Sequence, residues 1–375
     1  MSKVAKFIQT LDLTPDQIAT RSGLGVARVQ AIRDGSAATL EELRALARGL
    51  RLPIRSFATD AREAPEVSAM FRLEKDARSD LGLEAMSEYV AAALSILPKR
   101  TVLADWIRDL QGPAETYADA ENLALSFRNA FVGGSPDPLF ELPAILERAG
   151  GVVQGRLETS RFEGASLAVC GYAFIFVSPR FSGRMLFTLA HELGHLLAHH
   201  RADRSIVFDL ASQIGAVGHS SKKELFVDAF ASNLLMPADG VAIALRQIRQ
   251  SLKVKSDAIG DIEILYLALF YGVSFEVAAR RCEQLELLPD GGAYSLADHI
   301  KKNYGNAEKL AKQLSLPARQ VIHFPQVSQG LMAAAIDNID SGNVSLGWVT
   351  DKFGCSAAEV YSAKSLREHV RGNRH

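Results

Sequence analysis

The sequence predicts a mainly α-helical protein with one small antiparallel sheet, an α+β fold class. Apolar residues recur at helical spacing through most of the 375 residues. Helix-start signals stand at Thr14 and Thr39, each followed three positions later by Gln or Glu. Strand-like runs gather in one stretch, between residues 152 and 177. Short strands among many helices are typical of this class.

The composition bounds the class of protein. A chain of 375 residues can form two or three domains. Its 42 basic and 43 acidic side chains nearly balance, which argues against a protein that coats nucleic acid with its whole surface. The three cysteines, Cys170, Cys282 and Cys355, lack metal-knuckle spacing and suggest a reducing cytosol. No apolar run approaches the roughly 20 residues of a membrane span, and the first residues lack a signal-peptide core. We therefore expect a cytoplasmic protein that does not associate with membranes.

Residues 1–57 are predicted to form a helix-turn-helix module. Within Gln17–Gly35, a turn that contains Gly23 separates two short helical segments. The pattern resembles the Xre/Cro-like family over about fifty residues, although DNA binding does not follow automatically from this layout. Nine basic and five acidic side chains in residues 1–56 leave a charge of +4, which favours phosphate contacts.

Base recognition by this module is not implied by its layout. The second helix of the motif begins at Val26 and Ala27, which can touch a thymine methyl group but cannot make a bidentate hydrogen-bond contact. Arg28, Gln30 and Arg33 remain as candidates for DNA contacts. The alternative is a module that docks a partner protein or packs on the rest of the chain.

Residues 58–114 are predicted to be a helical connector without a recognisable function. A polar linker, 58–65, opens it, and Gly112-Pro113 ends it. Helices are expected next at Tyr117–Phe131 and Leu139–Ala149. Three strands should follow at Val152–Leu157, Ser166–Cys170 and Tyr172–Val177, with a tight reversal near Gly171.

The segment His191-Glu192-Leu193-Gly194-His195 is a candidate metal site. Apolar residues on both sides continue a helical pattern, and histidines four residues apart share one face of a helix. Both imidazoles can therefore bind one cation, with Glu192 beside the metal-bound water as a general base. The alternative is a core helix with two hydrogen-bonded histidines, but buried imidazoles and a buried carboxylate would need partners.

Catalytic zinc usually has three protein ligands and one open position, so a further ligand is required. His199 lies one turn farther along the same helix, yet three ligands on one straight helix cannot converge on a tetrahedral centre. Glu224 is the better candidate, because it opens a second apolar helix that runs to Pro237. Asp228, one turn beyond Glu224, could accept the second ring N–H of a ligand histidine.

Phe187–His199, followed by Glu224 and the segment Asp228–Pro237, resembles the ImmA/IrrE family of bacterial metallopeptidases over roughly residues 115–290. The resemblance implies a zincin-like core that binds Zn²⁺ through His191, His195 and Glu224, with Glu192 as the catalytic base. It also implies a substrate, a helix-turn-helix repressor encoded nearby. Its cleavage would relieve repression in a stress, DNA-damage or phage-related response, including antiphage defence, with single-stranded DNA as a candidate signal.

Residues 291–375 are predicted to form a further helical module. The segment from Leu331 to Ser356 resembles a degenerate helix-turn-helix, although simple helical packing is the favoured interpretation. Candidates for stabilising an oxyanion stay open among Tyr172 and three histidines, His199, His200 and His219.

Two other classes of function stay open. The chain could be a DNA-binding regulator or an antitoxin-like partner-binding protein that uses the peptidase fold as a sensor or scaffold. Glu192 argues against the regulator, because a scaffold has no chemical need for a general base. A stable stoichiometric complex without cleavage would be the sign of the antitoxin-like protein.

Cys170 is a candidate inhibitory zinc ligand. It is expected on the strand pair just before the metal helix, and zinc strongly favours the thiolate form of cysteine. A thiolate at the open position of the metal would keep the peptidase inactive until an activating signal arrives. The commoner alternative is a small strand residue packed as a hydrophobe.

Overall fold

The computed structural model describes residues 3–10, 13–50, 81–156, 162–200, 204–210 and 221–372. Contacts divide the chain into two compact units. One unit is Met1–Thr101 with Leu157–Arg161 and Gln326–His375, and the other is Val102–Arg156 with Phe162–Pro325. Residues 58–80 of the expected connector lie outside the described residues. The expected division at residues 114 and 290 falls inside the second unit, so the four-part division stays a prediction.

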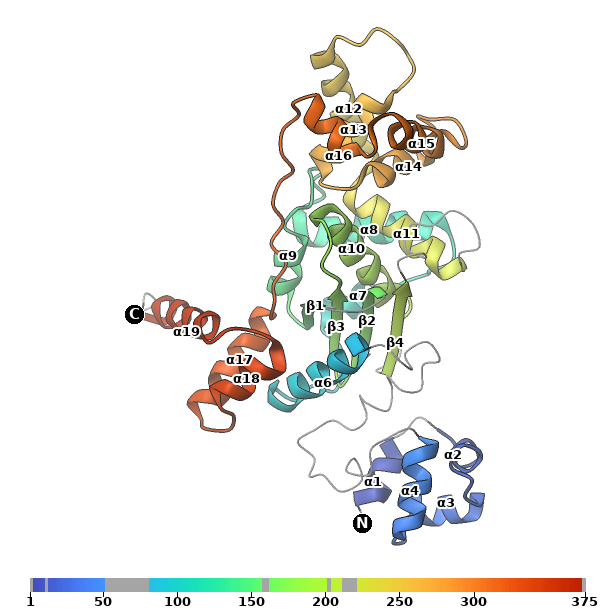
Figure 1. Cartoon of the computed structure of the whole chain (residues 1–375), viewed down its shortest axis with the longest axis vertical. Coiled ribbons are helices and arrows are strands. Elements are labelled where there is room, and N and C mark those ends of the chain that lie inside the picture. The colour runs from blue at the N-terminus through green and yellow to red at the C-terminus, as the bar shows by residue number, and fades with distance from the viewer. Residues whose placement is uncertain are drawn as a thin grey trace. The chain divides into compact units, whose positions relative to one another are not determined.

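The first unit contains two groups of helices (Figure 1). The N-terminal group is α1 (Lys3–Thr10), α2 (Pro15–Ser22), α3 (Val26–Arg33) and α4 (Leu40–Gly49). The other group is α6 (Leu81–Ile96), α17 (Gln329–Asp340), α18 (Leu346–Phe353) and α19 (Ala357–Gly372).

The second unit contains the sheet and the remaining helices. Its strands are β1 (Val152–Arg156), β2 (Phe162–Val169), β3 (Tyr172–Val177) and β4 (Arg204–Leu210). Its helices are α7 (Asp105–Leu110), α8 (Tyr117–Val132), α9 (Leu142–Ala149), α10 (Ser182–Ala198), α11 (Lys222–Leu235), α12 (Ala238–Leu252), α13 (Asp261–Tyr271), α14 (Phe275–Gln284), α15 (Gly292–Tyr304) and α16 (Ala307–Gln313).

The N-terminal helices follow the capping signals of the sequence. Thr14 and Thr39 both form complete capping boxes, at the starts of α2 and α4. Gly23 ends α2 in the left-handed conformation with φ of 74°, which glycine adopts without steric cost. Ile18, Val29 and Leu46 join α2, α3 and α4 in a common apolar core.

The segment at 331–356 contains most of α17 and all of α18, which both pack on α6. This arrangement fits a degenerate helix-turn-helix and simple helical packing alike. The rings of Tyr89 on α6 and Phe353 on α18 lie 5.1 Å apart, edge to face. The Asn338 amide on α17 donates to the Ile96 carbonyl oxygen at the end of α6, at 3.2 Å.

The sheet confirms the α+β class, with one correction to its predicted direction. β2 and β3 form an antiparallel hairpin whose last pair is Val169 and Tyr172. Its two-residue loop, Cys170-Gly171, has φ of 49° and 72°, as a type I′ turn requires. However, β1 pairs with β3 in parallel, so the wholly antiparallel sheet predicted from the sequence is wrong.

The strand order β1-β3-β2-β4 explains this difference. β1 joins the second strand of the hairpin, which runs in the same direction as β1, rather than its neighbour in sequence. A fourth strand, β4, pairs antiparallel with β2 and was not predicted. Leu157, the expected end of the first strand, lies outside the described residues.

Helices α10 and α11, most of whose residues are buried, pack together beside this sheet. α10 contacts β2, β3 and α11, and α11 contacts α8 (Figure 1). Gly194 allows a close approach of α10 to α11, since a Cβ atom added there would lie 2.9 Å from Cδ1 of Phe230. This approach sets the spacing between the two helices that carry the candidate ligands.

Two buried guanidinium groups hold the C-terminal end of α11. Arg281 is fully buried, and its Nε donates to the Met236 carbonyl oxygen at 2.8 Å. Arg128 donates to the Leu234 carbonyl oxygen, and burial lowers the pKa of this guanidinium. Cations that bind the last carbonyls of a helix also interact favourably with its dipole. Over the described ranges, no single helix is long and apolar enough to cross a membrane.

Candidate metal centre

His191 and His195 lie on helix α10, and both side chains are buried. Every residue from Met185 to Ala198 is buried, and the two histidines are 0% and 1% exposed. Four residues make about one helical turn, so both rings lie on one face of α10, edge to face, with centroids 5.0 Å apart.

Helix α11 brings the third candidate ligand to the same point. The Ser221 side chain caps this helix by accepting a hydrogen bond from the Glu224 backbone N–H, which fixes Glu224 in the first turn. The Glu224 carboxylate lies 3.3 Å from His191 Nε2 and 3.6 Å from His195 Nε2. One potential ligand atom of each of the three residues lies within 4.8 Å of the others.

These separations fit a zinc ion. Two ligands bound at about 2.0–2.1 Å and a tetrahedral angle lie about 3.4 Å apart, close to the observed distances. Two imidazole nitrogens and one carboxylate oxygen are also a donor set of catalytic zinc sites, which keep a fourth position open.

The outer nitrogen of each histidine has a neighbour that can set its tautomer. His191 Nδ1 lies 2.9 Å from Oδ1 of Asp228, so this nitrogen can donate to the carboxylate and leave Nε2 toward Glu224. His195 Nδ1 lies 3.0 Å from Nδ1 of His199. His199 is thus a neighbour of a candidate ligand, on the side of the ring opposite Glu224, which the sequence analysis did not anticipate.

Glu192 is fully buried, and its carboxylate lies against the backbone of β2. A Cβ atom added to Gly164 would lie 2.1 Å from Oε1 of Glu192 and 2.8 Å from Cγ2 of Thr188. Glycine is therefore required at this position for the observed placement of Glu192. The sequence analysis missed Gly164, because the contact joins a strand to a helix and leaves no local pattern.

The structure does not bring Cys170 to the cluster. Cys170 occupies the hairpin turn rather than a strand, and it lies six positions beyond Gly164 along the chain, about 20 Å at 3.3 Å per residue. The group of described residues that could hold a metal is His191, His195 and Glu224. This arrangement gives no support to Cys170 as a zinc ligand.

The open candidates for an oxyanion donor stay unassigned. His200 is buried, and its Nε2 lies 3.0 Å from Oγ of Ser166 on β2. Tyr172 directly follows the hairpin turn. His219 lies outside the described residues.

Two of the candidate DNA-binding side chains, those of Arg28 and Gln30, are bound within their own module. The Arg28 guanidinium pairs with Glu42, Nε to Oε1 at 2.6 Å, and it holds the pKa of that carboxyl at about 2. It also donates to the Ala37 carbonyl oxygen, while the Gln30 amide donates to Asp34 at 2.9 Å. The Arg33 carbonyl oxygen accepts a hydrogen bond from Gln9. DNA contacts by these residues stay a prediction.

Comparison with known families adds an independent observation. Residues 155–283 match the family model of the IrrE N-terminal-like domain of peptidase family M78. The matched IrrE-like segment contains α10 and α11, and hence all three candidate ligands and Glu192. This similarity supports a metallopeptidase of the ImmA/IrrE type. No curated protein matches the chain.

Proposed function

We propose that the protein is a zinc-dependent endopeptidase whose substrate is a helix-turn-helix transcriptional repressor. Cleavage of that repressor would relieve repression in a stress, DNA-damage or phage-related response. The observation that carries the peptidase activity is the convergence of His191, His195 and Glu224 within an IrrE-like segment. The repressor as substrate rests on the family resemblance of the sequence.

The three ligand side chains would hold zinc between α10 and α11. A bound zinc ion would supply Lewis-acid activation of water and of the scissile carbonyl group. Asp228 would keep Nδ1 of His191 protonated, so that Nε2 offers its lone pair to the metal.

Glu192 would move the protons of the reaction. Its carboxylate would take a proton from the attacking water and deliver it to the leaving amine. Gly164 and Thr188 enclose this side chain, which restricts it to few orientations and favours a reproducible position for proton transfer.

The test is incubation with the repressor encoded by the neighbouring gene, with and without single-stranded DNA, followed by mass spectrometry. We expect the parent protein to cleave the repressor and Glu192→Gln to leave it intact while keeping its fold and zinc, because an amide cannot accept the proton. A stable stoichiometric complex without cleavage would instead favour the antitoxin-like alternative.

The metal is tested separately by elemental analysis. We expect about one zinc per chain, and a large loss in Glu224→Ala, since catalytic zinc needs three protein ligands. Glu121→Ala, an exposed carboxylate on α8, is the matched control. Full zinc occupancy in Glu224→Ala would reject Glu224 as a ligand.

A further inference from the structure

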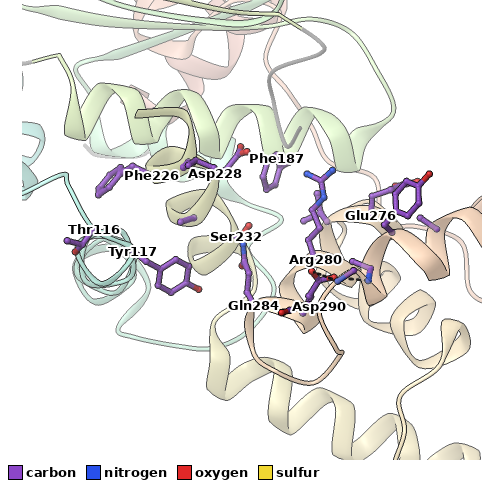
Figure 2. Close-up of a pocket in the computed structure, with 18 of the residues that line it drawn as sticks. Thr116, Tyr117, Phe187, Phe226, Asp228, Ser232, Glu276, Arg280, Gln284 and Asp290 are labelled. Carbon is purple, nitrogen blue, oxygen red and sulfur yellow. Dashed lines mark hydrogen bonds between the residues drawn. The ribbon is translucent and has the colours of Figure 1, made fainter. Parts of the chain in front are cut away.

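A cavity of about 870 Å³ lies next to the candidate metal centre. The residues that line it come from α10, α11, α14 and α15 and from the start of α8. Figure 2 shows Phe187 and Asp228 on one side of it and Asp290 on the other, with the Arg280 side chain between them. This volume is within the usual range for ligand pockets.

Two residues that line the cavity lie beside a candidate metal ligand. Phe187 lies four residues before His191 and thus one helical turn away along α10. Asp228 lines the cavity and also contacts Nδ1 of His191 at 2.9 Å. A polypeptide positioned at the metal could therefore place a nearby side chain in this cavity.

The inner wall of the cavity is apolar. Phe187 and Phe226 are about nine-tenths buried or more, and Val277 and Ala293 line the side formed by α14 and α15. Tyr294, which is 73% exposed, also lines the cavity. Such a wall suits the apolar stem of a long side chain.

The charges of the lining are strongly unequal. Among the described residues of the lining, five carry carboxylates and one, Arg280, carries a guanidinium; the carboxylates are those of Glu115, Asp228, Glu276, Glu283 and Asp290. Glu283 is already engaged, because it accepts hydrogen bonds from the backbone N–H groups of Gly291 and Ala293. Asp228 is engaged as well, because it contacts Nδ1 of His191. The three remaining carboxylates, those of Glu115, Glu276 and Asp290, still outnumber the guanidinium, which favours a cationic ligand.

We propose that this cavity is a specificity pocket that receives a Lys or Arg side chain of the substrate polypeptide. The methylene stem would pack on Phe187 and Phe226, and the cationic head would lie near the carboxylates of Glu276 and Asp290. Lys and Arg combine an apolar stem with a charged head, as this lining demands. The proposal rests on the proposed peptidase function, since it names the substrate class of that site.

The test measures binding in the full chain that carries Glu192→Gln, so that cleavage does not interfere. The probes are fluorescein-labelled, alanine-based peptides that differ at one central position, which is Lys, Arg, Ala or Glu. We expect the Lys and Arg peptides to bind about tenfold more tightly than the Glu peptide. Asp290→Asn and Glu276→Gln should each reduce this preference about threefold. Asp257→Asn, which removes an exposed carboxylate outside the cavity, should leave it unchanged.

The outcomes separate this proposal from the proposed function. Preference for Lys and Arg that is lost in the cavity variants supports the pocket, even if the parent protein cleaves no polypeptide and the peptidase proposal fails. Equal binding of all four peptides, or preference for Glu through Arg280, overturns the pocket even if the repressor is cleaved. An equal loss of preference in Asp257→Asn and Asp290→Asn also overturns it, because the effect would then be one of overall charge.

Discussion

At the scale of single residues, the candidate centre combines local and non-local features. The spacing of His191 and His195 could be predicted from the sequence, because one helical turn brings both imidazoles to one face. Glu224 could be inferred from the helix that it opens. The contact of Gly164 with Glu192 could not, since it depends on how closely β2 approaches α10. The same holds for His199, whose contact with His195 depends on a rotamer.

Substitution of Gly164 tests whether the position of Glu192 matters. In Gly164→Ala, the new Cβ would clash with Oε1 of Glu192, so the carboxylate must move. Displacement of a catalytic group by about 1 Å can cost about 10²-fold in rate. We therefore expect kcat to fall by about this factor, with zinc content and KM little changed.

The control for this prediction is Gly330→Ala. Gly330 lies in α17, and a Cβ atom added there meets no other atom within 4 Å. Parent-like kcat in Gly164→Ala would show that Glu192 tolerates the shift or that another base is used.

At the scale of elements, the structure shows which predictions depend on neighbours in sequence. Helices α2 and α4 begin where Thr14 and Thr39 predict, because a capping box involves only residues three positions apart. The direction of β1 was predicted wrongly, because it depends on which strand lies beside β1, and β1 pairs with β3 rather than with β2, its neighbour in sequence. The two buried guanidinium groups at the C-terminal end of α11, which we call the arginine clamp, were also not predicted from the sequence. Arg281 follows Met236 by 45 residues, so no local pattern joins them.

Loss of this clamp should weaken both the fold and the metal centre. Arg281→Met leaves the Met236 carbonyl oxygen and the Asn233 side chain without their donor, at a cost of about 3 kcal/mol. Because α11 also carries Glu224 and Asp228, we expect weaker zinc binding as well. Thermal melting with and without zinc measures both effects.

The neighbouring Arg280→Met is the matched control. Arg280 is only partly buried, so its loss should change stability by about 0.5 kcal/mol or less. Equal melting temperatures for the two variants would contradict the prediction that Arg281 stabilises the end of α11.

The contact between α3 and α4 should depend on pH. Glu42 binds Arg28 and also the backbone N–H of Thr39, and these hydrogen bonds lower its pKa from 4.5 to about 2. A depressed pKa contributes stability above the unfolded value, so this contribution is complete above about pH 4.5 and lost as the pH falls toward 2. In Glu42→Gln, this part of the pH dependence should be absent.

Hydrogen–deuterium exchange of residues 26–49 in the full chain can measure this effect. We expect the parent protein to be more protected than Glu42→Gln near neutral pH and the two to converge in acid. A constant difference between the two proteins at every pH would show that ionisation of Glu42 does not contribute to this contact.

At the scale of the whole molecule, charge is distributed unevenly along the chain. The full chain has a net charge of −1, whereas residues 1–56 carry nine basic and five acidic side chains. DNA binding is therefore expected of the N-terminal module rather than of the chain as a whole. Arg28 and Gln30 are engaged within the module, and Val26, at the start of α3, is 44% exposed. These features favour phosphate contacts by other basic side chains over base recognition.

We accordingly predict weak DNA binding with little sequence preference and a steep dependence on salt. If about three phosphates are neutralised, affinity should fall about 40-fold between about 50 and 200 mM salt. Fluorescence anisotropy of the full chain with random and promoter duplexes measures this. Arg33→Ala should weaken binding to both duplexes equally, whereas Arg28→Ala should chiefly destabilise the module through the loss of its pair with Glu42. Nanomolar discrimination of one promoter from random DNA would contradict the prediction, because it requires base contacts that the engaged Arg28 and Gln30 do not offer.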